Sequence, residues 1–213
     1  MSRIRAHLFL DQRNVNGQTL EHNLEGVQVL DDAVIRPLNN PVSANGALAV
    51  LRGNLAPDGA VMKASAASPK FFQHRGRAIV FDDPAAMNAA CADANLDCDE
   101  NSVLVLRNAG PVGAPGMPEW GGLPIPKKLL DRGVRDIVRV SDARMSGTHY
   151  GSCILHVSPE AAIGGPLALV QSGDWIEVDV PARSLHLDVS DDELARRKAA
   201  WRPAPEPFAR GFV

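Results

Sequence analysis

Hydrophobic residues fall in short runs separated by glycine, proline, asparagine and aspartate. Runs of this kind, rich in β-branched residues and bounded by turn formers, predict strands. Several runs are apolar at every position, which is typical of strands covered on both faces, by closure into a barrel or by helices. The predicted strands are Val27–Leu30, Ala47–Leu51, Ala78–Phe81, Val103–Leu106, Ile137–Val140, Ser152–Val157, Asp174–Val180 and Ser184–Val189.

Helices are fewer and are marked by their end signals. Asp83 and Pro84 offer a capping carboxylate and a proline that the first helical turn tolerates. Ser190, followed three residues later by Glu193, forms the serine-to-glutamate spacing of a capping box. With no repeat and no clear linker, the pattern predicts one α/β domain over residues 1–213, mostly β with flanking helices. The predicted helices are Ala85–Ala94, Pro124–Arg132 and the segment from Ser190 through Trp201.

Composition narrows the class of protein. The chain is 45% hydrophobic and 22% charged, which is ordinary for a folded domain, and its net charge of -3 gives no general attraction to nucleic acid or anionic membranes. Aromatic residues make up only 5%, so base-stacking platforms are not expected. No window approaches the roughly 18 apolar residues of a membrane span. Three widely spaced cysteines suit neither a disulfide framework nor a structural zinc site, which favours a cytoplasmic setting.

The first candidate for chemistry is the glycine- and proline-rich segment Arg107–Gly122, directly after a predicted strand. Its glycines allow backbone amides to approach a ligand closely, but their spacing matches neither a dinucleotide fingerprint nor a P-loop. Glu119 within this segment could bind a hard metal ion or act as a general acid or base. A solvated loop glutamate is the alternative, and spacing alone favours it.

The second candidate is Ser141–Gly151, again just after a predicted strand. Ser146 and Thr148 place two hydroxyls around a glycine, where they could grip a substrate oxygen or present a basic serine that a nearby metal ion would have to stabilise. An ordinary Ser/Thr turn is the alternative. A triad of Ser146, His149 and Asp142 lacks the surrounding G-x-S-x-G elbow, so a hydrolase is less favoured. Neither His149 nor His156 has a second ligand at metal spacing.

Five motifs follow one another along the chain: Gly53–Val61, Leu106–Pro111, Pro115–Glu119, Ser141–Thr148 and His156–Ala162. Together, and in this order, they resemble the C-terminal part of the dihydroxy-acid and sugar-acid dehydratases. The resemblance covers residues 17–201, and the residues at 117–119 and 142–148 resemble the aldonate branch, which acts on arabinonate, xylonate and similar acids. The branched-chain dihydroxy-acid branch is the alternative.

The resemblance implies a fold and a chemistry. It implies the swivelling β/α barrel domain of the aconitase type, a β-barrel flanked by helices. It also implies a hydro-lyase that converts a 2,3-dihydroxy acid to a 2-keto-3-deoxy acid with Mg²⁺ and a 2Fe–2S or 4Fe–4S cluster. By the same resemblance, Ser146 matches the serine base, Glu119 a magnesium ligand and Thr148 a substrate-binding hydroxyl.

The family pattern is incomplete in this chain, because the cluster-binding N-terminal domain cannot be mapped onto it. Cys91, Cys98 and Cys153 match no cluster motif and are better interpreted as buried or surface thiols. We therefore expect no dehydratase activity from the chain alone. The expected partners are a sugar acid and the missing domain or subunit. Exposure of the face that would dock that domain favours a homo-oligomer. A non-catalytic binding or assembly module is the alternative from a different class.

Overall fold

The computed structural model describes residues 1–114, 119, 122–144 and 150–203. The chain divides into two compact units, Met1–Gly46 and Ala47–Val213. The first contains a 3-10 helix at Ser2–His7 and the short helix α1 at Leu20–Asn23, which Thr19 caps by accepting a hydrogen bond from the His22 amide at 3.2 Å. Within residues 1–46, Leu24 is the one buried hydrophobic side chain.

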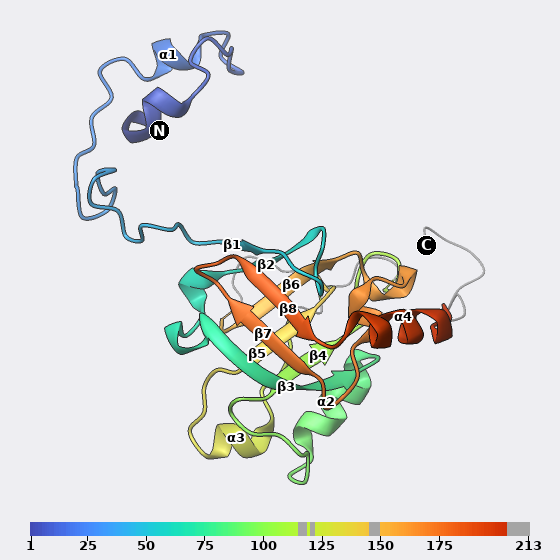
Figure 1. The fold of residues 1–213 in the computed structure, drawn as a ribbon. Helices are drawn as coiled ribbons and strands as arrows, with labels where there is room; N and C mark the ends of the chain where they lie inside the picture. Colours follow the sequence, from blue (N-terminus) through green and yellow to red (C-terminus); the bar gives the residue numbers. More distant parts are fainter. Residues whose placement is uncertain (115–118, 120–121, 145–149, 204–213) are drawn as a thin grey trace. The chain divides into compact units, whose positions relative to one another are not determined.

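The second unit contains an eight-stranded mixed sheet in the order β1-β2-β6-β5-β4-β3-β7-β8 (Figure 1). The neighbours from β3 to β6 are parallel, and the outer pairs are antiparallel. The strands are β1 Ala49–Leu51, β2 Gly59–Met62, β3 Gln73–Phe81, β4 Val103–Leu106, β5 Val138–Ser141, β6 Cys153–Ser158, β7 Trp175–Asp179 and β8 Ser184–Asp188.

Hydrogen bonds between the end of β1 and β8 nearly close this sheet into a barrel. The Arg52 amide donates to the Arg183 carbonyl and the Arg52 carbonyl accepts from the Leu185 amide, both at 2.9 Å. Gly53 allows the close approach, because a Cβ at this position would lie 2.1 Å from the Leu185 carbonyl oxygen. Closure leaves β1 and β8 with few free edge groups and encloses the inward-facing side chains.

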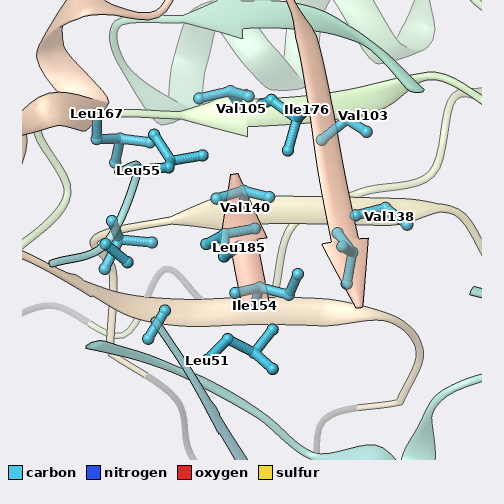
Figure 2. Close-up of a cluster of buried hydrophobic side chains, with 14 of the residues drawn as sticks. Leu51, Leu55, Val103, Val105, Val138, Val140, Ile154, Leu167, Ile176 and Leu185 are labelled. Atoms are coloured by element: carbon cyan, nitrogen blue, oxygen red, sulfur yellow. The ribbon is translucent and has the colours of Figure 1, made fainter. Parts of the chain in front are cut away.

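Alternation along the central strands divides the apolar residues between two clusters. One fills the barrel with side chains from all eight strands, including Val105, Val140 and Ile154 (Figure 2). The other lies on the outer face of β4 to β6, where Leu104 and Leu155 pack with residues of α2 (Pro84–Ala92) and α3 (Lys127–Asp131). Both faces of the central strands are therefore buried, which explains their continuous apolar runs.

The two capping side chains start their helices as predicted, whereas the Glu193 carboxylate of the predicted capping box accepts from Arg196 and Arg197. The Asp83 carboxylate accepts a hydrogen bond from the Ala86 amide at 2.8 Å at the start of α2, with Pro84 in its first turn. The Ser190 hydroxyl accepts from the Glu193 amide at 3.3 Å at the start of α4 (Asp191–Ala200). The expectation of a strand-rich α/β domain with flanking helices is confirmed. Of the helices in the described ranges, none is long and apolar enough to cross a bilayer.

One strand prediction was wrong, and one strand was not predicted. Val27–Leu30 forms no strand, because a strand needs a ladder partner and this segment has none within residues 1–46. Conversely, β2 was not among the predicted strands; it begins within the Gly53–Val61 motif and ends at Met62. Its short sequence becomes a strand because β1 and β6 pair with it on either side.

Candidate functional site

The candidate site lies where parallel strands end. Strands β4, β5 and β6 run in the same direction, so their carboxyl ends meet at one edge of the sheet. Ligands of open α/β sheets bind at such an edge, and the same geometry gathers the segments that follow the strands here. The segments beginning at Arg107, Asp142 and Pro159 belong to three of the motifs singled out in the sequence.

Asp142 joins these three segments. Its carboxylate is 2% exposed and accepts hydrogen bonds from the Ala109 amide at 2.9 Å and the Ala161 amide at 2.8 Å. Burial raises the pKa of Asp142, and the backbone hydrogen bonds oppose that shift. Since each oxygen accepts a backbone hydrogen bond, Asp142 holds the loops in place; Ser146 and His149, the other members of the alternative triad, lie outside the described residues.

Glu160 holds the glycine-rich loop from the other side. Its carboxylate accepts from the Val112 amide at 3.0 and 3.1 Å and from the Gly113 amide at 3.1 Å. A Cβ at Gly110 would lie 2.5 Å from a Glu160 carboxylate oxygen, so glycine is needed for this close approach. The Val112 and Gly113 amides are thus occupied by a protein carboxylate, and packing against Glu160 explains the glycine at 110.

Arg107, the first residue after β4, anchors the start of the same loop. Its guanidinium pairs with Asp82 and donates to the carbonyls of Ala168 at 2.8 Å and Val170 at 3.2 Å. Asn108 follows with a left-handed φ of 61°, and its side-chain amide nitrogen donates to the Asp82 carbonyl at 3.4 Å. Asparagine tolerates this conformation better than most residues, so Arg107 and Asn108 together set the direction in which the loop leaves the sheet.

Glu119 is exposed and lines a small cavity of about 120 Å³ at the carboxyl end of β4. Met87 and Asn88 of α2, Leu106 of β4 and Leu123 form much of its wall. A carboxylate here fits Mg²⁺ as an oxygen donor. Over the described ranges, however, no three His, Cys, Asp or Glu side chains converge as a metal site, so Glu119 would supply one ligand of a larger set.

A second cavity, of about 370 Å³, lies beside β6 and is lined partly by Asp58, Pro111, His156 and Glu160. Partial burial, and after it the positive charge of Arg144, lowers the pKa of His156. A neutral imidazole is therefore favoured near neutral pH, which leaves one ring nitrogen able to accept a hydrogen bond.

The other predicted site residues, Ser146 and Thr148, lie outside the described residues, as does His149. The flanks of their segment are described: Asp142 and Ala143 are buried on one side, and Gly151 and Ser152 on the other. The structure thus brings together the loop containing Glu119 and both flanks of the segment containing Ser146.

The three cysteines are buried free thiols. Burial raises the pKa of Cys91 to about 11 and raises that of Cys98 and Cys153 as well. All three belong to the outer apolar cluster, among aliphatic side chains. Thiolates that hold an iron–sulfur cluster must converge and ionise, so these cysteines do not fit that role.

Sequence reasoning missed the residues that hold the loops. Asp142 was considered only for a triad, and Glu160 and Arg139 were not singled out. Their carboxylates and guanidinium serve backbone groups distant in sequence, such as the Ala109 amide for Asp142 and the Leu123 carbonyl for Arg139. The available signal was a charged residue within or next to an apolar strand, because a charge that is buried there requires partners.

Comparison with known proteins identifies the family of the chain. The family model described as dihydroxy-acid/6-phosphogluconate dehydratase C-terminal matches residues 33–213, so the chain belongs to this family. It is 55% identical to a 6-deoxy-6-sulfo-D-gluconate dehydratase of Pseudomonas putida, over 100% of this chain and 37% of the relative. It is 54% identical to an L-arabonate dehydratase of Azospirillum brasilense, over 94% and 34% of the two chains. A dihydroxy-acid dehydratase of Clostridium novyi is 46% identical, over 93% and 35%. The chain therefore spans about a third of the length of these relatives.

Proposed function

We propose that this chain forms the C-terminal, active-site-bearing part of a sugar-acid dehydratase. The proposed reaction removes water from an aldonate, a 2,3-dihydroxy acid, and yields a 2-keto-3-deoxy acid. The observation that carries the proposal is the convergence of the motif segments at one edge of the parallel strands, with Glu119 facing a cavity there. Identities of 55% and 54% to dehydratases named for sugar acids favour that substrate class.

In the proposed mechanism, the Ser146 alkoxide accepts the proton from C2 while the C3 hydroxyl departs as hydroxide, which leaves an enol. The proton held on Ser146 and the hydroxide together leave as water, which restores the alkoxide. The enol then gains a proton at C3, loses the proton of its C2 hydroxyl and becomes the ketone. Thr148 contacts the substrate next to the serine, and Glu119 binds Mg²⁺. In the assembled enzyme, Mg²⁺ and an iron–sulfur cluster supply Lewis acidity. The cluster ligands belong to the part of the enzyme that this chain does not contain.

The remaining features of the proposal concern assembly. The barrel would serve as a swivelling domain of the aconitase type, packed over an N-terminal domain or subunit that completes the site. Homo-oligomerisation and a cytoplasmic setting are part of the same proposal. Because the metal ion, base and Lewis acid must be fixed in one constellation, the chain alone is expected to be inactive.

The test is reconstitution. The purified chain is mixed with the N-terminal portion that its relatives carry, loaded with its cluster, in the presence of Mg²⁺. Formation of 2-keto acid is then measured for a panel of aldonates, for 6-deoxy-6-sulfo-D-gluconate and for 2,3-dihydroxyisovalerate. We expect activity only in the mixture and on sugar acids, and we expect Ser146→Ala to abolish it.

Ser65→Ala is the matched control, because Ser65 is exposed and lies outside both candidate loops. It should retain full activity. Activity confined to 2,3-dihydroxyisovalerate would assign the chain to the branched-chain dihydroxy-acid dehydratases. A folded chain that gives no activity with a cluster-loaded partner would refute the proposal and favour a binding or assembly module.

A further inference from the structure

Arg139 is a buried cation on the outer face of β5. Its position in the sheet register is between Leu104 of β4 and Cys153 of β6, both members of the outer apolar cluster. The residue is 4% exposed. A guanidinium kept in such surroundings is costly unless its donors are satisfied, so its partners show what it does.

The guanidinium contacts both candidate loops at once. Nη1 donates to the Leu123 carbonyl at 2.7 Å, just after the segment that contains Glu119. Nη2 donates to the Tyr150 carbonyl at 3.3 Å, just after the segment that contains Ser146. One segment follows β4 and the other follows β5. Within the described residues, this one guanidinium fork bonds the backbone just after Glu119 and just after Thr148.

Asp136 holds the fork in place. Its Oδ1 lies 3.3 Å from Arg139 Nη2 and accepts from the Ser152 amide at 2.7 Å. Its Oδ2 accepts from the Ser152 hydroxyl at 2.7 Å and from the Ser68 amide at 3.0 Å. Asp136 is 5% exposed and fully engaged, so it fixes the guanidinium and also secures the backbone that follows Tyr150.

Gly151 leaves room for this arrangement. It has a left-handed φ of 101°, and a Cβ there would lie 2.0 Å from Arg139 Nη2 and 2.7 Å from an Asp136 carboxylate oxygen. A side chain at 151 would therefore displace the guanidinium without changing its chemistry. This gives a second way to perturb the same contact.

We propose that Arg139, fixed by Asp136, is a positioning residue that sets the distance between the loop of Glu119 and the loop of Ser146 and Thr148. The inference rests on the proposed function for its catalytic consequence, although not for the geometry. Leu123 is four residues after Glu119, and Tyr150 is two residues after Thr148. At about 3.5 Å per residue, the backbone two to four residues from an anchor can reach at most about 7 to 14 Å from it.

Arg139→Lys is the main test variant, because it keeps the charge beside Asp136 but replaces the fork with a point donor that cannot serve both carbonyls. Arg135→Lys is the matched control: Arg135 is exposed, and among the described residues its guanidinium bonds the nearby Leu130 and Val134 carbonyls. Gly151→Ala provides the independent perturbation. The thermal midpoint of each variant shows whether the barrel still folds.

Two readouts are measured. In the full chain, hydrogen exchange of peptides that contain Leu123 and Tyr150 should be at least about tenfold faster in Arg139→Lys and Gly151→Ala, with barrel peptides unchanged. In the reconstituted enzyme, the Mg²⁺ concentration for half-maximal activity should rise about 10- to 100-fold, the range expected for a residue that supports a metal ligand. The value of kcat should fall about 100-fold. Arg135→Lys should match the parent protein in both.

Unchanged loop exchange in a folded Arg139→Lys chain would overturn the proposal, whatever the activity. Faster exchange with unchanged Mg²⁺ dependence and kcat in an active mixture would also overturn it. If the parent mixture is inactive, the proposed function fails, and hydrogen exchange alone decides whether Arg139 joins the loops.

Discussion

Closure of the barrel depends on the side chain of Asn54. Its amide nitrogen donates to the Leu187 carbonyl at 2.8 Å, and its amide oxygen accepts from the Leu187 amide at 2.7 Å. The side-chain amide thus pairs with β8 as a backbone peptide group would, next to the backbone hydrogen bonds that link the end of β1 to β8. Asn54→Ala removes both hydrogen bonds: the amide of the buried Leu187 loses the acceptor that Asn54 provides, whereas the Leu187 carbonyl still accepts from the Val189 amide at 2.9 Å.

The size of the effect follows from these contacts. A buried polar group left unpaired costs about 1–3 kcal/mol. Because Asn54 is half-buried, water replaces part of the loss, and we expect the free energy of unfolding to fall by about 1–2 kcal/mol in total.

Urea denaturation of the full chain, followed by circular dichroism, measures this difference as a lower midpoint at an unchanged slope. Asn95→Ala is the control, because Asn95 is exposed in a turn and its change should stay within about 0.5 kcal/mol. A loss below about 0.5 kcal/mol for Asn54→Ala would refute the reasoning that the amide closes the barrel.

Three further predictions follow from single residues. Asp142→Asn keeps one good acceptor for the Ala109 and Ala161 amides, so urea denaturation should show a loss on the order of 1–3 kcal/mol; an unchanged midpoint would contradict this account. Burial raises the pKa of Cys91 to about 11, so a thiol reagent at pH 8 should label none of the three cysteines until the chain is unfolded; rapid labelling of the folded chain would be inconsistent with it. Hydrogen bonds from two arginines lower the pKa of Glu193 from 4.5 to about 2. Its stabilising effect should therefore be complete above pH 4.5 and lost as pH falls toward 2, which carboxyl NMR titration checks; a midpoint near 4.5 would count against it.

Much of the local structure could be predicted from the sequence. The apolar run Val103–Leu106 is β4 with the same bounds, and the capping residues Asp83 and Ser190 start their helices as expected. These features depend on neighbours within a few residues, where side-chain periodicity and capping operate. The motifs also indicated the family, which the match over residues 33–213 confirms.

The candidate site could be predicted only in part from the sequence. The sequence pointed to two loops and to Glu119, and the structure places Glu119 at a cavity between α2 and the carboxyl end of β4. The sequence did not show that Glu160 accepts from amides of the glycine-rich loop, because Glu160 lies 47 residues after Gly113. The assignments of Ser146 and Thr148 rest on resemblance and stay predictions.

What the sequence by itself determined was the strand-rich pattern, the helix starts and the family. Only the tertiary structure decided the strand order, the near-closure of the sheet through Arg52 and Asn54, and the joining of two loops by Arg139. Periodicity and capping act between neighbours along the chain. The pairing of β1 with β8 and the partners of a buried guanidinium depend on which distant segments meet, and that choice is made by the packing of the whole domain.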